Sequence, residues 1–426
     1  MTTLYNLSIY FYYIIIYAAS FFNKKAKLWL DGRKNIFERL TLTLSKREGN
    51  SENKSEIRNP KSEIIWFHCA SLGEFEQGRP LIEKFRIQNL EFRILVTFFS
   101  PSGYEIRKNY SGADFIFYLP LDTPANAKKF IKIVRPALAI FIKYEFWYNY
   151  LNELHKKNIP TYLVSAIFRE EQHFFKWYNS FGKNTLKNFS HIFVQNQKSF
   201  QLLENIGIKN VTISGDTRFD RVSEIVRNKK SIPLIEKFKD GKQLIVAGST
   251  WEADEQLISD FGFSISDLKL IIAPHEISES RINSITHQLN NSIIIKFSEA
   301  NEENIKSATI LIIDNIGMLS SLYQYADIAY IGGGFGSGIH NILEATAYGI
   351  PVLFGPKYQK FNEAVELIER GGAFSINNSE ELKSKINLFL SDKFVIKIAS
   401  EIAKNFVSGN EGATKKIINF ITKNRH

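Results

Sequence analysis

The sequence predicts an α/β protein with two Rossmann-like, doubly wound parallel sheets that face each other across a cleft. Three observations support this fold class. The chain has 426 residues, 44% of them hydrophobic, which is enough for two domains with two cores. Short apolar runs alternate with amphipathic stretches, as in βαβ units. The polar stretch 216–242 interrupts this alternation, which then restarts.

Each series of apolar runs predicts six buried strands. The first series gives residues 64–67, 93–97, 115–117, 138–141, 162–164 and 191–194. The second gives residues 244–247, 270–273, 293–295, 310–313, 328–331 and 351–354. Ligands of open α/β sheets bind at the carboxyl ends of the strands, so functional residues are expected at those ends.

The same patterns predict the domain boundaries. They are a membrane anchor at 1–23, a basic helix and polar loop at 24–62, an N-terminal Rossmann-like domain at 63–225, a linker at 226–242, a C-terminal Rossmann-like domain at 243–400 and a C-terminal helix at 401–426. For that last helix, a crossing back to the N-terminal domain is one option.

The first residues predict a helix that anchors the chain in a membrane. No charged side chain precedes residue 24, and residues 4–22 are almost wholly aliphatic or aromatic, close to the ~20 residues that span a bilayer. Five basic residues follow within 24–34, which by the positive-inside rule places the rest of the chain in the cytoplasm. The alternative is an amphipathic or core helix docked on the protein, because Asn6 and Ser8 dilute the run.

Charge and cysteine content limit the partners. The net charge of +10 suits nucleic acid, an anionic membrane face or phosphorylated substrates. No nucleic-acid-binding motif accompanies that charge, so nucleic acid is ranked last. The single cysteine, Cys69, excludes an intramolecular disulfide and a cysteine-clustered metal site.

A glycine-rich loop follows the predicted strand at 328–331. Five glycines occur among residues 332–338, and the loop ends in Gly336, Ser337 and Gly338. Backbone N–H groups in such a loop can approach a phosphate closely. The loop therefore predicts a nucleotide site, and a glycine-rich turn kept for packing is the alternative.

The residues after the loop are predicted to start a helix whose positive end faces the same phosphate. Asn341 lies near the start of that helix, and the carboxylate of Glu344 lies one turn inside it. From there Glu344 can reach the two hydroxyls of a ribose.

A carboxylate also follows the first predicted strand, in the sequence Ser71-Leu72-Gly73-Glu74. At the lip of that strand, opposite the nucleotide loop of the other domain, Glu74 is the candidate general base for an attacking hydroxyl. The alternative is an ordinary first-turn carboxylate that complements the helix dipole.

Other strand ends carry weaker candidates. Glu145 follows the predicted strand at 138–141 and is expected to orient the acceptor or the base, or to form a structural ion pair with Lys143 or an arginine. Ser249, Thr250 and His275 follow strands of the second domain, where they can contact phosphate or base. A satisfied polar residue at a strand end is the alternative for each of these three.

No metal or cofactor is predicted. The sequence contains no Asp-x-Asp, and a monophosphate leaving group can be stabilised by backbone N–H groups without a divalent ion.

These residues resemble the 3-deoxy-D-manno-octulosonic acid (Kdo) transferase family of Gram-negative lipid A assembly, a group of inverting, metal-independent glycosyltransferases with the GT-B fold. The resemblance covers residues 66–374. Its most specific parts are residues 71–74, 118–122, 145–149, 248–250, 315–320, 338–344 and 351–356.

The resemblance implies the reaction and the roles of the domains. The donor is CMP-Kdo, the acceptor is the anionic lipid A precursor lipid IVA, and the enzyme is anchored at the cytoplasmic face of the inner membrane. The N-terminal domain binds the acceptor, with Ser71, Gly73 and Glu145 on that side and Glu74 as base. The C-terminal domain binds the nucleotide sugar.

The chain departs from the family pattern at several positions. Trp251 replaces the usual histidine after Ser-Thr, His275 lacks the preceding arginine of P-R-H, residues 165–167 replace N-A-R, and Arg218 stands where lysine is common. Two alternatives stay open: another GT-B enzyme, either a different glycosyltransferase or a nucleotide-sugar epimerase, and a non-catalytic, membrane-tethered nucleotide-sugar binder.

Overall fold

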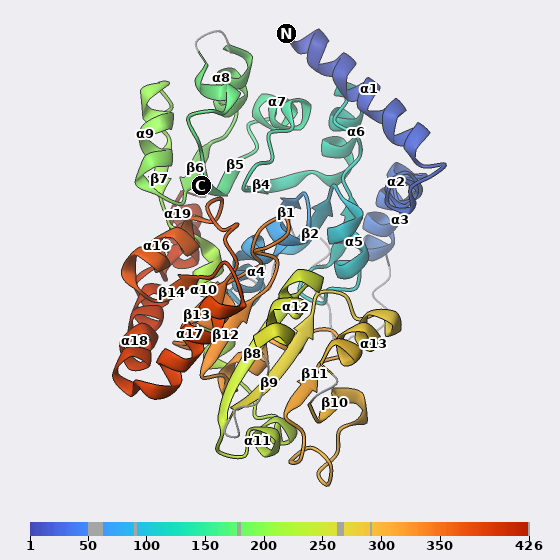
Figure 1. The fold of residues 1–426 in the computed structure, drawn as a ribbon. Helices are drawn as coiled ribbons and strands as arrows, with labels where there is room; N and C mark the ends of the chain where they lie inside the picture. Colours follow the sequence, from blue (N-terminus) through green and yellow to red (C-terminus); the bar gives the residue numbers. More distant parts are fainter. Residues whose placement is uncertain (50–62, 89–91, 177–179, 262–267, 290–291, 425–426) are drawn as a thin grey trace. The chain divides into compact units, whose positions relative to one another are not determined.

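The computed structural model describes residues 1–49, 63–88, 92–176, 180–261, 268–289 and 292–424 (Figure 1). The chain divides into two compact units: unit 1 is Met1–Arg221 with Gly412–His426, and unit 2 is Val222–Glu411. Within the described ranges each unit is built around a seven-stranded parallel sheet. This confirms the predicted fold class of two parallel-sheet α/β domains.

The strands of unit 1 lie in the order β3-β2-β1-β4-β5-β6-β7. They are β1 (Ile64–Cys69), β2 (Arg93–Phe98), β3 (Phe115–Tyr118), β4 (Pro136–Ile142), β5 (Thr161–Ala166), β6 (His191–Val194) and β7 (Val211–Ile213). The helices between them are α4 (Leu72–Gln88), α5 (Pro101–Arg107), α6 (Pro124–Val134), α7 (Tyr148–Lys156), α8 (Ser180–Leu186) and α9 (Gln197–Asn205), with a 3-10 turn at His173–Phe175. Helix α10 (Thr217–Arg227) crosses the boundary between the units.

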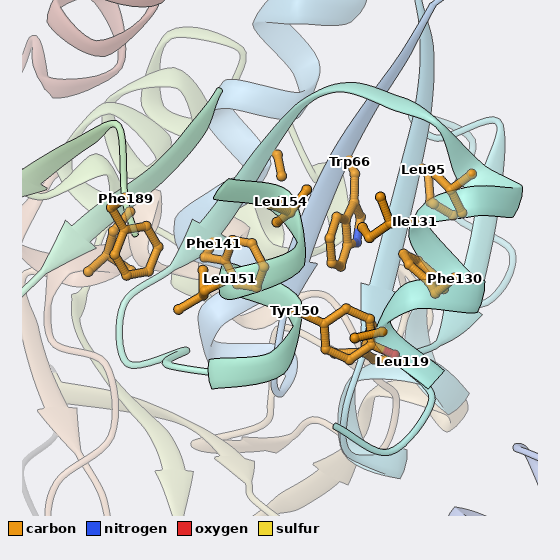
Figure 2. Close-up of a cluster of buried hydrophobic side chains, with 14 of the residues drawn as sticks. Trp66, Leu95, Leu119, Phe130, Ile131, Phe141, Tyr150, Leu151, Leu154 and Phe189 are labelled. Carbon is orange, nitrogen blue, oxygen red and sulfur yellow. The ribbon is translucent and has the colours of Figure 1, made fainter. Parts of the chain in front are cut away.

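The core of unit 1 explains why its strands are apolar on both faces. Every residue of β1 is buried, because helices cover the two faces of a parallel sheet. The indole of Trp66 on β1 lies at the centre of the cluster in Figure 2, with its ring centroid 4.9 Å from that of Phe130 and 5.7 Å from that of Tyr150. Its N–H donates to Thr97 Oγ1 at 2.8 Å. The edge-on rings and this hydrogen bond fix β1 against β2 and α6.

Helix α19 (Ala413–Lys423) belongs to unit 1 although it ends the chain. It packs on α4, and Phe420 stacks on His191 of β6 with ring centroids 4.1 Å apart. Its N-terminus is tied to α10 by Asp220, whose carboxylate accepts from the backbone N–H groups of Gly412 and Thr414. The C-terminal segment thus completes the core of the first unit.

Unit 2 has strand order β10-β11-β9-β8-β12-β13-β14. Its strands are β8 (Gln243–Thr250), β9 (Leu268–Pro274), β10 (Ile294–Lys296), β11 (Ile310–Ile312), β12 (Ile328–Ile331), β13 (Val352–Phe354) and β14 (Ala373–Ser375). Its helices are α11 (Pro233–Lys239), α12 (Glu252–Phe261), α13 (Glu279–Gln288), α14 (Leu319–Leu322), α15 (Leu343–Thr346), α16 (Asn362–Arg370), α17 (Ser379–Ser391) and α18 (Lys393–Gly409), with 3-10 turns at Phe297–Glu299 and Tyr323–Tyr325.

All twelve predicted strands are present, with ends shifted by a few residues. The sequence-based prediction missed β7 and β14, which are three-residue strands at the edges of the two sheets. Such short runs carry too few apolar residues to stand out from loops.

Each sheet reverses its strand order at one point, between β1 and β4 in unit 1 and between β8 and β12 in unit 2. Open α/β sheets bind ligands at the carboxyl ends of the strands beside such a reversal. Residues that follow these four strands are therefore the first place to look for a site.

The N-terminus forms three helices of unit 1: α1 (Thr2–Ala19), α2 (Lys24–Asp31) and α3 (Ile36–Gly49). No helix of the described part of the chain is both long and apolar enough to cross a membrane. The predicted single-pass anchor is thus unsupported, and much of the predicted polar loop within 24–62 lies outside the described residues.

Polar contacts of α1 give the physical reason. The Tyr5 hydroxyl donates to the buried carboxylate of Asp122, and Asn6 Oδ1 accepts from Asn149 Nδ2 at 2.9 Å. Ile9 packs into a small apolar cluster with Trp29 and Leu121. One side of the helix is therefore docked on the protein.

Candidate functional site

Non-glycine residues with positive φ occur at three strand ends of interest. Lys143 follows β4 with φ +68°, Ser165 lies in β5 with φ +55°, and Ser249 lies in β8 with φ +54°. Left-handed backbone costs free energy for residues with a Cβ, and such conformations gather at functional sites. Both sheets thus carry backbone strain at their carboxyl ends.

Glu74 lies in the first turn of α4, directly after β1. Its Oε2 accepts from the backbone N–H of Ser71 at 3.1 Å and also from the Ser71 hydroxyl. This is the return half of a capping box, in which an acidic residue closes the first turn of a helix. The structure therefore gives Glu74 a helix-capping contact, and a role as base requires the carboxylate to act from this position. Gly73 beside it is exposed, and an added Cβ would meet only Ser71 Oγ at 3.8 Å.

Glu145 is buried and hydrogen-bonded. Its Oε2 lies 3.0 Å from Nε2 of the fully buried His68 and accepts from the indole N–H of Trp147. His68 Nδ1 lies 2.9 Å from Thr97 Oγ1, which in turn accepts from Trp66. A chain of hydrogen bonds thus runs from the core of unit 1 to Glu145. The partners of Glu145 in this chain of hydrogen bonds are His68 and Trp147.

Several further charges surround the same edge of unit 1. Burial raises the pKa of Tyr144, and the charges that act on its hydroxyl are, in order, Arg169, Glu74, Arg218 and Asp216. Arg218 NH2 lies 2.7 Å from Asp216 Oδ2. Arg169 and Arg218 therefore lie close enough to Tyr144 to act on its hydroxyl, and Arg218 is paired with Asp216.

In unit 2 the glycine loop follows β12, and its first three glycines are needed for packing. A Cβ on Gly332 would lie 2.3 Å from the carbonyl oxygen of Ser249, and one on Gly334 would lie 2.6 Å from the backbone of Gly355. On Gly333, which has φ +91°, it would lie 2.5 Å from the carbonyl oxygen of Gly338. These positions admit only glycine because backbone meets backbone there.

The second part of the loop is open. Gly336 and Ser337 are exposed, and a Cβ on Gly336 would have no neighbour closer than 3.6 Å. Gly338 has φ +135°. Lys357 Nζ reaches this loop and donates to the carbonyl oxygen of Gly336 at 2.8 Å. The packing role and a possible anion-binding role therefore belong to different halves of the loop.

The helix after the loop begins later than the sequence predicts. Residues 339–342 are irregular, and α15 begins at Leu343 and has four residues. Such a helix contributes little dipole, so the prediction of an anion site at its N-terminus is corrected. Asn341 Nδ2 donates to Glu344 Oε1 at 3.1 Å, which places these two predicted residues side by side.

The predicted residues on β8 have different surroundings. Thr250 is buried, and its hydroxyl donates to Glu255 Oε1 at 2.9 Å. Ser249 is half-buried, and its carbonyl oxygen contacts Gly332. Thr250 thus forms a hydrogen bond in the interior of unit 2, whereas Ser249 lies against the glycine loop.

Three aromatic rings gather next to the loop. The ring of exposed His275 stacks on Trp251 and on His340, with both centroid distances 4.6 Å. The indole N–H of Trp251 donates to His340 Nε2 at 2.9 Å. Trp251 thus makes a direct contact with His340, two residues after the end of the loop.

A buried carboxylate, Asp254 on α12, joins these pieces. It accepts from the backbone N–H groups of Trp251 and Gly333, each at 2.9 Å, and from the hydroxyl of Tyr330 at 2.7 Å. These hydrogen bonds join the ends of β8 and β12 and the start of the glycine loop. Among the residues described, no cluster of three or more His, Cys, Asp or Glu side chains is placed to hold a metal ion.

Sequence reasoning missed Asp254, His340, Lys357 and Arg169 as parts of these edges. His340 could have been found, since it directly follows the glycine loop, and Lys357 since it follows a strand end. Asp254 and Arg169 carry no local signal, because their partners are distant in the sequence.

Two parallel-sheet units with candidate residues at their strand-order reversals define the GT-B class. The fold of a UDP-GlcNAc 2-epimerase from Neisseria meningitidis matches this chain with a TM-score of 0.61 at 14% identity, covering 85% of this chain and 100% of that one. At this identity the likeness shows the fold alone.

Sequence comparisons identify the family. The model of the family described as 3-deoxy-D-manno-octulosonic-acid transferase (kdotransferase) matches residues 34–221. A 3-deoxy-D-manno-octulosonic acid transferase of Aquifex aeolicus is 32% identical over 81% of this chain and 91% of its own length. One from Rickettsia felis is 28% identical over 84% of this chain and 79% of its own length. The chain belongs to the Kdo transferase family and is a glycosyltransferase, which confirms the resemblance.

Proposed function

We propose that the protein transfers Kdo from CMP-Kdo to the lipid A precursor lipid IVA, with inversion and with Glu74 as the general base. The observation that carries this proposal is the position of Glu74 in a member of this family. It lies just after the carboxyl end of β1, at the strand-order reversal of unit 1.

In the proposed reaction unit 1 supplies the base. The acceptor hydroxyl attacks the Kdo carbon bound to the CMP phosphate, the new glycosidic bond forms, and the bond to the phosphate breaks. The hydroxyl proton passes to Glu74, and the bonding electron pair leaves on the phosphate of CMP. Ser71 and Gly73 lie beside the base, and Glu145, held by His68 and Trp147, gives the acceptor side a fixed shape.

Unit 2 holds the donor in this proposal. Gly336, Ser337 and Gly338 form the more exposed half of the glycine loop, whose shape is fixed by hydrogen bonds from the Gly336 and Gly338 N–H groups to the carbonyl oxygen of Gly333. The Ser337 hydroxyl and the positive charge of Lys357 are assigned to the phosphate there. The neighbouring Asn341 and Glu344 are assigned to the ribose. Ser249 and His275 line the same end of the sheet, whereas Thr250 acts indirectly through its contact with Glu255.

The N-terminal helices are proposed to hold the enzyme on the cytoplasmic face of the inner membrane without spanning it. Helix α1 and the turn after it expose many large apolar side chains: Leu4, Leu7, Tyr10, Phe11, Tyr13, Ile14, Ile15, Tyr17, Phe21 and Phe22. Lys24, Lys25 and Lys27 follow at once. An apolar surface next to basic residues is the composition that binds an anionic lipid surface.

A groove in unit 1 supports contact with a lipid. It has a volume of about 770 Å³ and is bounded by α1, α2, α3 and α6. Aromatic rings of Tyr10, Tyr17 and Trp29 line it, and Lys34 and Lys129 lie at its borders. Apolar walls with cationic groups match the chemistry of an acylated, phosphorylated acceptor.

The test of the activity is incubation of the purified full chain with CMP-Kdo and lipid IVA, followed by mass spectrometry. The expected product is the acceptor increased by the mass of one or more Kdo residues, with release of CMP. CMP release without a heavier lipid, or no turnover under conditions where the protein is folded, would contradict the proposal. The number of added residues is read directly from the mass.

The membrane proposal is tested by co-sedimentation with vesicles of anionic phospholipid. Phe11→Ser combined with Ile14→Ser should reduce binding at least several-fold, because both side chains are more than half exposed and their loss leaves the docked face of α1 intact. The matched control is Ile87→Ser with Ile106→Ser, two exposed apolar residues elsewhere in unit 1. Equal binding of both double variants would place the membrane contact elsewhere.

A further inference from the structure

The contact between Trp251 and His340 fixes the protonation of a histidine at the glycine loop. The planes of the two rings are nearly parallel, at 14°, and the indole N–H of Trp251 donates to His340 Nε2 at 2.9 Å. An indole nitrogen is a donor only, so His340 Nε2 must accept with a lone pair. The proton of a neutral His340 is then on Nδ1.

The surroundings of His340 also favour its neutral form. Burial lowers the pKa of His340, the neighbouring His275 lowers it further, and Asp254 opposes them. His275 covers both rings of the pair. Lys357 lies at the same loop through its bond to Gly336, and Glu344 follows on α15. A charged imidazolium would place two N–H donors against each other at the Trp251 contact.

His340 is part of the wall of the loop. Its backbone N–H donates to the carbonyl oxygen of Gly332 at 3.1 Å, and a Cβ on Gly333 would lie 3.0 Å from its Cδ2. His340 therefore packs against the first half of the glycine loop.

We propose that Trp251 is a positioning residue that holds His340 neutral, with the proton on Nδ1, so that the donor phosphate meets a hydrogen-bond donor there instead of a second cation. With His340 neutral, Lys357 is the charged group that serves the phosphate at this loop. Protonation of His340, and any effect of it on donor affinity, is then expected at a lower pH than for an ordinary histidine. This inference rests on the proposed function in one respect, that the loop holds a nucleotide phosphate.

The first experiment measures the tautomer and the pKa of His340 by ¹⁵N NMR of the full chain with labelled histidine. His340→Gln assigns the resonance. In the wild type, Nε2 should show the shift of an unprotonated nitrogen and Nδ1 that of a protonated one. Trp251→Phe keeps an aromatic ring against His275 but removes the N–H, and should raise the pKa of His340 toward its ordinary value. An Nε2–H tautomer in the wild type, or an unchanged pKa in Trp251→Phe, would overturn the proposal.

The second experiment measures CMP binding by calorimetry at pH 5.5 and pH 8 for the wild type, Trp251→Phe, His340→Gln and the double variant. The ratio of variant to wild-type affinity cancels the ionisation of CMP itself. For Trp251→Phe that ratio should be about 3- to 10-fold larger at pH 5.5 than at pH 8, because a newly formed imidazolium attracts the phosphate. In the His340→Gln background the Trp251→Phe change should have no such pH dependence.

The outcomes separate this inference from the proposed function. A wild type that does not bind CMP would contradict the nucleotide assignment, while the NMR result would still decide the role of Trp251. CMP binding with a pH-independent ratio would contradict the inference and leave the nucleotide assignment standing. If Trp251→Phe does not fold, the tautomer of the wild type decides alone.

Discussion

The two units share an architecture but carry different side chains at the strand-order reversals of their sheets. In unit 1 the carboxylates Glu74 and Glu145 stand at the edge, each held by donors from nearby residues. In unit 2 the corresponding carboxylate, Asp254, is buried behind the edge and holds backbone N–H groups in place. The surface there is made of glycine backbone and aromatic rings.

This difference shows how one topology supports two kinds of chemistry. A partly exposed carboxylate such as Glu74 can take a proton, whereas the buried Asp254 fixes the backbone at the start of the glycine loop by accepting from backbone N–H groups. The topology of the sheets therefore determines where each candidate site lies. The residues that follow the strands determine whether it supplies the base or binds the donor.

The largest expected effect concerns Glu74. Glu74→Gln keeps an acceptor for the Ser71 N–H, since glutamine also serves in a capping box, but it cannot accept a proton. We expect normal folding, retained CMP binding and a loss of turnover of about 10²- to 10⁴-fold. Transfer kinetics, thermal unfolding and CMP calorimetry measure the three quantities. Turnover close to that of the wild type would show that Glu74 serves only as a cap.

The next effect separates the two halves of the glycine loop in unit 2. Gly332→Ala forces a Cβ to within 2.3 Å of the Ser249 carbonyl oxygen and should destabilise unit 2 by about 3 kcal/mol or more. Gly336→Ala is the matched control, since its Cβ has no neighbour closer than 3.6 Å, and should leave stability within about 1 kcal/mol. Denaturant unfolding measures both, and equal losses would refute the division of the loop.

A smaller effect is expected from the cation of unit 2. Lys357→Met should weaken CMP binding about 3- to 10-fold, because a charge-assisted contact at an exposed site is worth about 1 kcal/mol. The exposed Lys360 on the same connection provides the control Lys360→Met, with no expected change. Calorimetry at two salt concentrations should show a weaker salt dependence for Lys357→Met only.

The smallest effect concerns pH and the C-terminal helix of unit 1. Burial lowers the pKa of His191 to about 4, below its ordinary value of about 6.5. The folded state then binds fewer protons than the unfolded state, so stability falls as the pH drops below about 6.5 and this loss is complete below about 4. The half-exposed ring limits the effect to about 1 kcal/mol.

His191→Gln retains a partner for Thr212 Oγ1 and cannot be charged. Relative to the wild type, its stability should therefore improve between pH 7.5 and pH 5, and hydrogen exchange in α19 should become less sensitive to acid. The comparison with the wild type cancels the opposite contribution of Asp122, whose pKa burial raises to about 6. An identical pH dependence in both proteins would show that His191 does not govern the attachment of α19.

Sequence patterns predicted the fold more completely than the site. Buried parallel strands are continuous apolar runs, so residues 328–331 and 244–247 could be found from neighbouring residues alone. The glycine loop was located for the same reason, but its division into a packed and an open half depends on Ser249 and Gly355, which are distant in the sequence. The helix after the loop was predicted to start near Asn341, but α15 begins at Leu343, because helix ends are the least certain part of a sequence pattern.

The N-terminal segment shows the same limit. Its apolar composition predicted a membrane anchor, but composition does not reveal that Tyr5 and Asn6 bond to residues more than a hundred positions away. Only the tertiary contacts distinguish a docked helix with one exposed apolar side from a helix that spans a membrane.

The sequence by itself determined the class of this protein: two parallel α/β sheets, the family motifs and the carboxylate after the first strand. These are local features, since hydrophobic periodicity and short motifs are written in adjacent residues. Tertiary structure alone decided the distant partners: Glu145 on His68, Asp254 on Gly333 and Trp251 on His340. Hydrogen bonds act over about 3 Å, so they depend on which distant segments the fold brings together.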